Sequence, residues 1–192
     1  MPPKVKVTKE DIIKTALELL RSNGEEAFNA RSIAAAIGCS TQPVFSNFET
    51  MEELKGAVIL AAYELYQGFI KNEVESGKYP KYKAFGMAYI RFAKEERQLF
   101  KLLFMRDRTG EDLSPGPDYY ESVEIIMQKN GISREKAMLM HLEIWTSVHG
   151  IAVMIVTSFI DLEWELISSI TSDVYQGIRT RHLQGENDND SK

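Results

Sequence analysis

Apolar and polar residues alternate along this chain with the period of an α-helix, and no segment shows the strict alternation of a β-strand. Thr8 and Asp11 form a capping-box pattern, and Gly24 ends the apolar stripe that follows. The same reasoning predicts further helices over residues 30–37, 41–47, 50–75, 82–96, 97–105, 118–130, 134–158 and 162–183. We therefore expect an all-α protein of about nine helices.

Residues 30–47 are the most informative part of this pattern. Asn29 can cap the first of two short helices, and Gly38 permits a left-handed exit from it. Ser40 can cap the second helix, in which Pro43 is tolerated because it lies in the first turn. Such a helix-turn-helix lets its second helix lie in the major groove of DNA. A helical hairpin whose polar residues only face water would show the same pattern.

The predicted helix boundaries and the segments rich in Gly and Pro indicate the domain organisation. Residues 1–50 are expected to form the head, and a helix at about 51–75 connects it to a second domain over residues 51–184. Residues 107–117 contain two Gly and two Pro and are expected to form a mobile loop. Residues 185–192 are expected to be a disordered tail.

Composition and charge narrow the function. The chain has 192 residues and a formal net charge of −5, and its first 50 residues carry six basic and six acidic side chains. Recognition of DNA must therefore rest on a few placed groups and not on a basic field. The single cysteine, Cys39, excludes an intramolecular disulfide and a cysteine-built zinc site. The longest nearly uncharged apolar stretch, residues 150–160, is too short to span a bilayer, so we expect a soluble, cytoplasmic protein.

Catalytic chemistry has little support. His141 and His149 are two turns apart on one predicted helix, too far for the zinc pairing of a His-Glu-x-x-His motif. No glycine-rich phosphate-binding motif occurs, and adjacent carboxylates such as Glu52 and Glu53 diverge on a helix. We predict no enzymatic activity, no metal site and no cofactor.

A resemblance to a known family lies in residues 34–54, which read AAAIGCSTQPVFSNFETMEEL. This segment resembles the DNA-binding region of the tetracycline-repressor (TetR) family of bacterial transcriptional regulators, and the likeness extends over roughly residues 8–62. More loosely, residues 145–150 are similar to the Trp-x-x-x-His-Gly signature of one group of the family's regulatory domains. The resemblance implies a homodimer that binds an inverted-repeat operator on double-stranded DNA and responds to a small-molecule effector, most often as a repressor.

The resemblance also implies which residues contact DNA. They are Arg31, Ser40, Thr41, Gln42, Pro43, Phe45, Ser46, Asn47 and Lys55. Two positions depart from the family pattern, since Phe45 stands where Tyr is common and Met51 stands where Lys is common. Lys55 is the nearest substitute for that lysine. Because each lost phosphate contact reduces counterion release, we expect weaker and less salt-sensitive binding than in a lysine-bearing relative.

Residues 79–140 are rich in Phe, Tyr and Met, and the resemblance implies that this region and the following helix line a pocket for a small apolar or aromatic effector. The expected lining residues are Phe85, Tyr89, Phe92, Phe104, Met105, Tyr120, Met127, His141, Trp145 and His149. Such aromatic stripes are more often packed core, and His149 can equally be a structural histidine.

A single short helix in the major groove contacts only a few base pairs, so a protein that recognises DNA in this way must act as a dimer. Residues 144–156 are apolar almost all the way round, as expected of a helix buried against both its own domain and a partner. The predicted dimer residues are Ile151, Ile155, Ile167, Ile170, Val174 and Ile178. A helix that is simply central in a monomer is one alternative. A helical ligand-binding or scaffold protein without DNA affinity is another.

Overall fold

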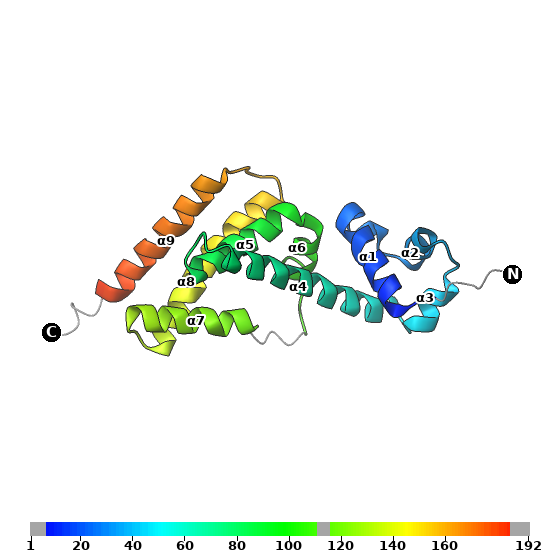
Figure 1. Cartoon of the computed structure of the whole chain (residues 1–192), viewed down its shortest axis with the longest axis horizontal. Helices are drawn as coiled ribbons and strands as arrows, with labels where there is room; N and C mark the ends of the chain where they lie inside the picture. Colours follow the sequence, from blue (N-terminus) through cyan, green and yellow to red (C-terminus); the bar gives the residue numbers. More distant parts are fainter. Residues whose placement is uncertain (1–6, 111–115, 185–192) are drawn as a thin grey trace. The chain divides into compact units, whose positions relative to one another are not determined.

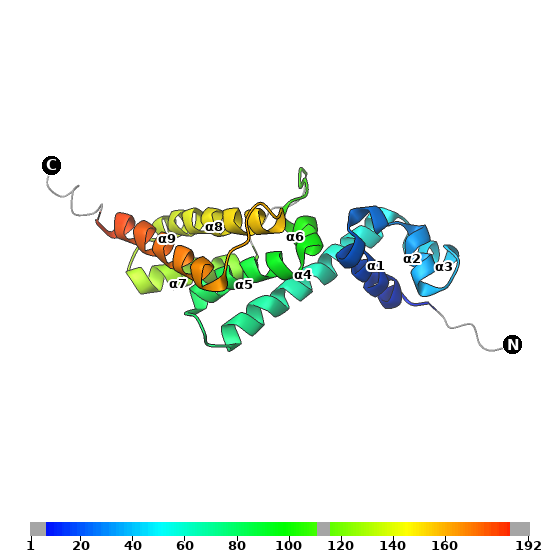
Figure 2. The same cartoon turned by 90° about the horizontal axis from the view of Figure 1, so that it is seen from above.

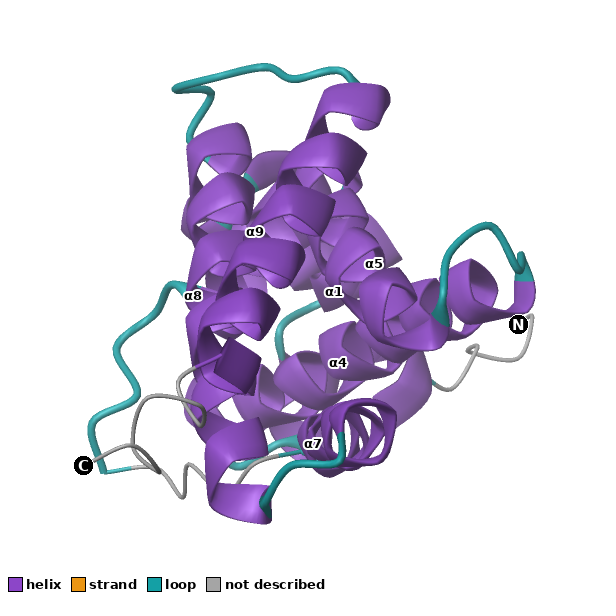
Figure 3. Ribbon diagram, turned by 90° about the vertical axis from the view of Figure 1, so that its left-hand side faces the viewer, coloured by secondary structure: helices purple, strands orange, loops and turns teal. Residues whose placement is uncertain are grey.

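The computed structural model describes residues 7–110 and 116–184, and within them the chain forms nine α-helices, one 3₁₀ helix and no strand (Figure 3). The all-α prediction is therefore confirmed. The helices are α1 (Lys9–Asn23), η1 (Glu25–Ala27), α2 (Ala30–Ile37), α3 (Gln42–Asn47), α4 (Met51–Glu75), α5 (Lys81–Glu95), α6 (Arg97–Phe104), α7 (Pro117–Asn130), α8 (Arg134–Val156) and α9 (Trp164–Gln184) (Figure 1). The predicted tail, 185–192, and residues 111–115 of the predicted loop lie outside the described residues.

The helices gather into two compact units. The first comprises Met1–Gln67 with Glu96–Arg106, and the second comprises Gly68–Glu95 with Asp107–Lys192. The first unit therefore continues past residue 50 along α4 and also includes α6. Since α4 is one uninterrupted helix, its backbone belongs to the first unit at its start and to the second at its end.

The first unit is built around the apolar faces of α1, α2 and the start of α4. Ile12, Ile33 and Leu54, one from each helix, are completely buried. At the edge of this core Arg21 on α1 donates from Nε to Oε2 of Glu96 over 2.6 Å. Glu96 is 4% exposed, and its hydrogen bond raises the pKa of Arg21, so α1 is fixed to the start of α6 by a charged pair.

Local sequence signals set where α1 begins and ends and where α2 begins. Thr8 and Asp11 form the capping box of α1, and Gly24 ends the helix at φ 77°. The side chain of Asn29 caps α2 by accepting the backbone N–H of Ser32 over 2.9 Å. These contacts satisfy N–H groups that have no partner within the helix, so the predicted starts of α1 and α2 are confirmed.

In the second unit α8 packs against α5, α7 and α9, and Figure 2 shows α9 lying alongside α8. By length and mean hydropathy α8 is the one described helix that could cross a membrane. A helix surrounded by three others has the same apolar composition for a different reason, because it supplies the core. Ala137, Met140 and Ala152 of α8 are completely buried.

Candidate functional site

The two short helices α2 and α3 form the predicted helix-turn-helix in the first unit. Gly38 ends α2 in the left-handed region, at φ 80° and ψ 33°, and its N–H donates to the carbonyl of Ala35 over 3.1 Å. The N–H of Cys39 then donates to the carbonyl of Ala34 over 2.9 Å. This double closure turns the chain within a few residues, and Ile33 and Val44 bury the inner faces of the two helices.

The start of α3 differs from the prediction. Ser40 was expected to cap this helix, but the N-cap is Thr41, at φ −70° and ψ −15°, and no side-chain cap hydrogen bond forms there. The prediction was wrong because it relied on a side-chain cap at Ser40, and the helix begins one residue later without such a cap. Ser40 is exposed, Thr41 is half-buried, and Pro43 lies in the first turn as predicted.

The outer face of α3 carries Gln42, Phe45 and Ser46, all exposed. Phe45 leaves 53% of its surface accessible, which is unusual for a phenylalanine in a packed domain. Ser46 donates its hydroxyl to the carbonyl of Gln42 over 2.8 Å, and Asn47 donates its amide to the carbonyl of Pro43 over 2.8 Å. Ser46 thus presents an acceptor to the outside, while the amide of Gln42 offers a donor and an acceptor.

Two basic side chains of the first unit, Lys55 and Lys9, pair with carboxylates. Lys55 donates from Nζ to Oε1 of Glu25 over 2.7 Å, and its side chain is 28% exposed. Lys9 pairs with Glu53 at 3.5 Å. Arg31 on α2 is exposed. A phosphate contact from Lys55 therefore has to compete with Glu25, which sequence reasoning missed because 30 residues separate the two partners.

Three of the predicted ligand residues meet in the second unit. Tyr89 on α5 and His149 on α8 share a hydrogen bond of 2.8 Å between the phenol oxygen and Nδ1. The imidazole stacks on Trp145, with ring centroids 5.0 Å apart and planes inclined by 17°. Burial raises the pKa of Tyr89 and lowers that of His149, so both side chains are held neutral. Trp145 remains 41% exposed, which leaves an open edge on this cluster.

A second tyrosine–histidine pair lies two turns away. Tyr82 and His141 share a hydrogen bond of 3.0 Å, and Tyr119 of α7 meets the imidazole edge-on at 5.1 Å. Burial lowers the pKa of His141 and raises that of Tyr82. Sequence reasoning missed Tyr82 and Tyr119. The signal that could have found Tyr82 is register, because two tyrosines seven residues apart on α5 face two histidines eight residues apart on α8.

The other predicted ligand residues do not form one group. Phe92 is completely buried, with its ring edge-on to Phe69 at 5.3 Å, which is a packed-core position. Phe85 and Met127 are partly buried, and Tyr120 is 49% exposed. The remaining two, Phe104 and Met105, belong to the first unit.

The predicted dimer residues divide by burial. Ile151, Ile155 and Ile167 are at most 6% exposed within their own chain, because neighbouring helices already cover them. Within the single chain they offer little surface to a partner, and their place at a dimer interface stays a prediction. Partly exposed positions are Ile170, Val174 and Ile178. The large apolar residues that are exposed on α8 and α9 are Met138, Leu139, Leu142, Trp145 and Leu166.

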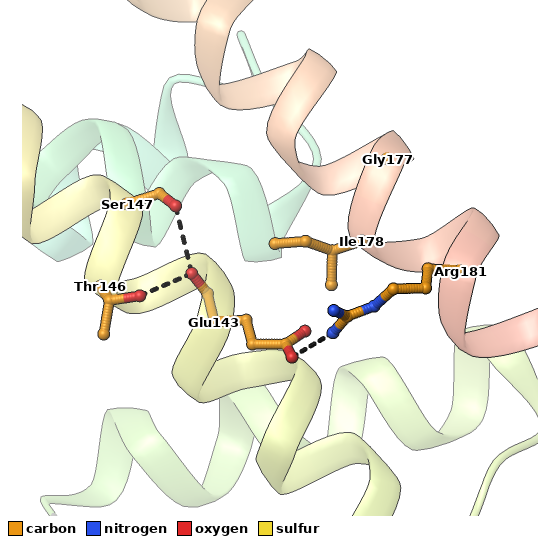
Figure 4. Close-up of a pocket in the computed structure, with 6 residues that line it drawn as sticks. All are labelled: Glu143, Thr146, Ser147, Gly177, Ile178 and Arg181. Carbon is orange, nitrogen blue, oxygen red and sulfur yellow. Dashed lines mark hydrogen bonds and ion pairs between the residues drawn. The ribbon is translucent and has the colours of Figure 1, made fainter.

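A shallow hollow of about 380 Å³ lies between α8 and α9 (Figure 4). It is lined by Glu143, Thr146, Ser147, Gly177, Ile178 and Arg181. The carboxylate of Glu143 forms an ion pair with Arg181 and accepts a hydrogen bond from Nε2 of His182 over 2.8 Å. Burial opposes ionisation of Glu143, but the hydrogen bonds from His182 and Arg181 outweigh it and lower the pKa. The hollow is thus lined by an ion pair, two hydroxyl-bearing side chains, a glycine and one apolar side chain, Ile178.

Comparison with known proteins gives a family match over part of the chain. Residues 82–167 match the family described as tetracyclin repressor-like, C-terminal domain. The match begins in α5, ends in the first turn of α9 and contains both tyrosine–histidine pairs. No curated protein matches the chain at a significant level.

Proposed function

We propose that this chain, whose residues 82–167 match a tetracyclin repressor-like C-terminal domain, is a transcriptional regulator of the tetracycline-repressor family that binds an inverted-repeat DNA operator as a homodimer and leaves it when a small-molecule effector binds. The observation that carries the proposal is the exposed α3 of the helix-turn-helix, whose outer face presents an amide, an acceptor oxygen and a ring. A repressor of this kind acts in the cytoplasm, where its operator lies.

Pairing follows from the length of the reading helix. A helix from Gln42 to Asn47 has six residues and reads only part of a half-site. Two copies related by a two-fold axis read two half-sites about 34 to 36 Å apart, which makes the operator an inverted repeat. Affinity and specificity both rise because two weak contacts act together.

The exposed faces of α8 and α9 support the pairing. Leu139, Leu142 and Leu166 leave about half of their surface accessible, between 49% and 53%. Partly exposed Ile170, Val174 and Ile178 continue this apolar face along α9. A second copy that covers it removes apolar area from water, and the side chains at its contact face fill the hollow beside Glu143 and Arg181.

The two tyrosine–histidine pairs support the effector site. Each pair combines an aromatic surface with a hydrogen-bonding group in a partly buried setting, which suits a small aromatic or apolar molecule with a polar substituent. Such a ligand must bind the two states of the protein unequally to control DNA binding, and typical couplings are about 1 to 3 kcal/mol. Since α4 belongs to both units, it is the element through which this difference is transmitted.

The test of DNA recognition is in vitro selection of bound DNA from a random pool with the full-length chain. We expect an inverted repeat, and the double variant Gln42→Ala, Phe45→Ala should lose it. The matched control is Gln128→Ala, because Gln128 is an exposed glutamine of α7 in the second unit. Absence of any enriched sequence would favour a scaffold protein without DNA affinity. Sedimentation equilibrium tests the dimer, and a monomer at micromolar concentration would contradict it.

Effector binding can be followed through Trp145. The variant Trp164→Phe leaves Trp145 as the single tryptophan, and its indole stacks on His149. A molecule that binds at this cluster displaces or covers the stack, so the fluorescence of Trp145 should change in a saturable way. The same titration with His149→Phe removes the hydrogen bond to Tyr89 and should weaken binding of the polar substituent.

A further inference from the structure

The outer face of α3 has a composition that bears on which bases it reads, provided that the proposed DNA binding is correct. Gln42 and Phe45 are three residues apart in one short helix and therefore share a face. Both are exposed, and the ring of Phe45 leaves 53% of its surface to solvent. Val44 is the buried residue of α3, so the ring of Phe45, one residue further along, faces outward and is available for contact.

The lack of basic residues around α3 excludes the commonest kind of contact to guanine. The commonest specific contact in the major groove is Arg or Lys to guanine. Residues 32–54, which contain the turn, the whole of α3 and the start of α4, hold no Lys or Arg. Guanine is therefore not read from α3 by its usual partner, and specificity must come from neutral groups.

The neutral groups present fit adenine and thymine. A glutamine amide pairs with N6 and N7 of adenine through two hydrogen bonds. A phenylalanine ring has no donor or acceptor, and the one apolar group on the major-groove edge of the bases is the C5-methyl of thymine. The hydroxyl of Ser46 is engaged with the backbone of Gln42, so it adds an acceptor and no second apolar contact.

We propose that α3 selects A·T base pairs, with Gln42 pairing to adenine and the ring of Phe45 packing on the C5-methyl of a thymine. A contact of this ring with a thymine methyl specifies sequence, whereas a contact with the phosphate backbone would only position the protein.

The experiment uses the full-length chain and the operator recovered by selection. Each thymine is replaced in turn by deoxyuridine, which removes the C5-methyl and changes nothing else. At one thymine per half-site we expect wild-type affinity to fall roughly fourfold, the value of one buried methyl group. Phe45→Ala should bind the thymine and deoxyuridine operators equally. Phe45→Tyr keeps the ring and should retain the difference. Replacing an adenine by 7-deazaadenine should weaken the wild type and leave Gln42→Ala unaffected.

The outcomes separate this inference from the function on which it rests. If no operator is enriched, the proposed function fails and this inference fails with it. If an operator is enriched but no deoxyuridine weakens the wild type, or if Phe45→Ala remains as sensitive as the wild type, DNA binding stands and thymine reading is refuted. In that last case Phe45→Ala weakens binding to both operators by the same factor, which assigns the contact of the ring to the DNA backbone. Thermal melting controls for folding. Because Phe45 is exposed, the melting temperature of the Phe45→Ala variant should equal that of the wild type.

Discussion

The ion pair between Lys55 and Glu25 gives the sharpest prediction about the head. The ammonium of Lys55 lies 2.7 Å from the carboxylate, and that carboxylate is 75% exposed. A DNA phosphate approaching Lys55 must displace Glu25. Changing Glu25 to Gln removes the competitor while it keeps the shape of the side chain, so the lysine becomes available to the phosphate.

The size of the effect follows from the exposure of the pair. Ion pairs of this kind contribute about 0.2 to 1 kcal/mol, because water and salt screen them. Releasing Lys55 should therefore tighten DNA binding about 1.4- to fivefold at low salt. One additional neutralised phosphate should also steepen the slope of log K against log salt by about 0.9.

The assay is a fluorescence-anisotropy titration on the selected operator over a salt series. Glu26→Gln is the matched control, because it removes an equal charge from the neighbouring exposed residue. If the gain comes from Lys55, the double variant Glu25→Gln, Lys55→Gln should lose it. Equal affinities and slopes for Glu25→Gln and Glu26→Gln would refute the reasoning, since only general charge would then matter.

Three further predictions concern stability. Phe92→Ala should cost about 3 to 5 kcal/mol in urea unfolding, against less than about 0.5 kcal/mol for exposed Tyr120→Ala, and equal costs would contradict the core position. Asn29→Ala loses the cap on the N–H of Ser32 and should cost about 0.5 to 2 kcal/mol, and an unchanged midpoint would mean that water replaces it. Burial lowers the pKa of His149 from 6.5 in the folded state. The contribution of the neutral imidazole to the free energy of unfolding is therefore complete above that pH, and it is lost as the pH falls through the lowered pKa. His149→Gln should reduce the loss of stability between about pH 7.5 and pH 5, and an unchanged loss would assign it to other groups.

The sequence alone determined the features that depend on neighbouring residues. The capping box of Thr8 and Asp11, the cap at Asn29 and the left-handed turn at Gly38 are confirmed because each is completed by residues at most five positions apart. The helical period then predicted the all-α class, and the turn pattern indicated the family that the match over residues 82–167 supports. The start of α3 was misplaced by one residue, because the prediction relied on a side-chain cap at Ser40 and the helix begins at Gln42 without one.

Only the tertiary structure decided which residues meet. Nothing local relates Lys55 to Glu25 or Tyr82 to His141, since these contacts depend on how whole helices pack. The same holds for burial on α8, where an apolar surface all the way round is consistent with either a core or an interface. Packing against three neighbouring helices buried Ile151 and Ile155 and left Leu142 exposed. Short-range hydrogen bonds can be predicted from neighbouring residues in the sequence. Contacts between distant segments depend on the free energy of packing of the entire fold.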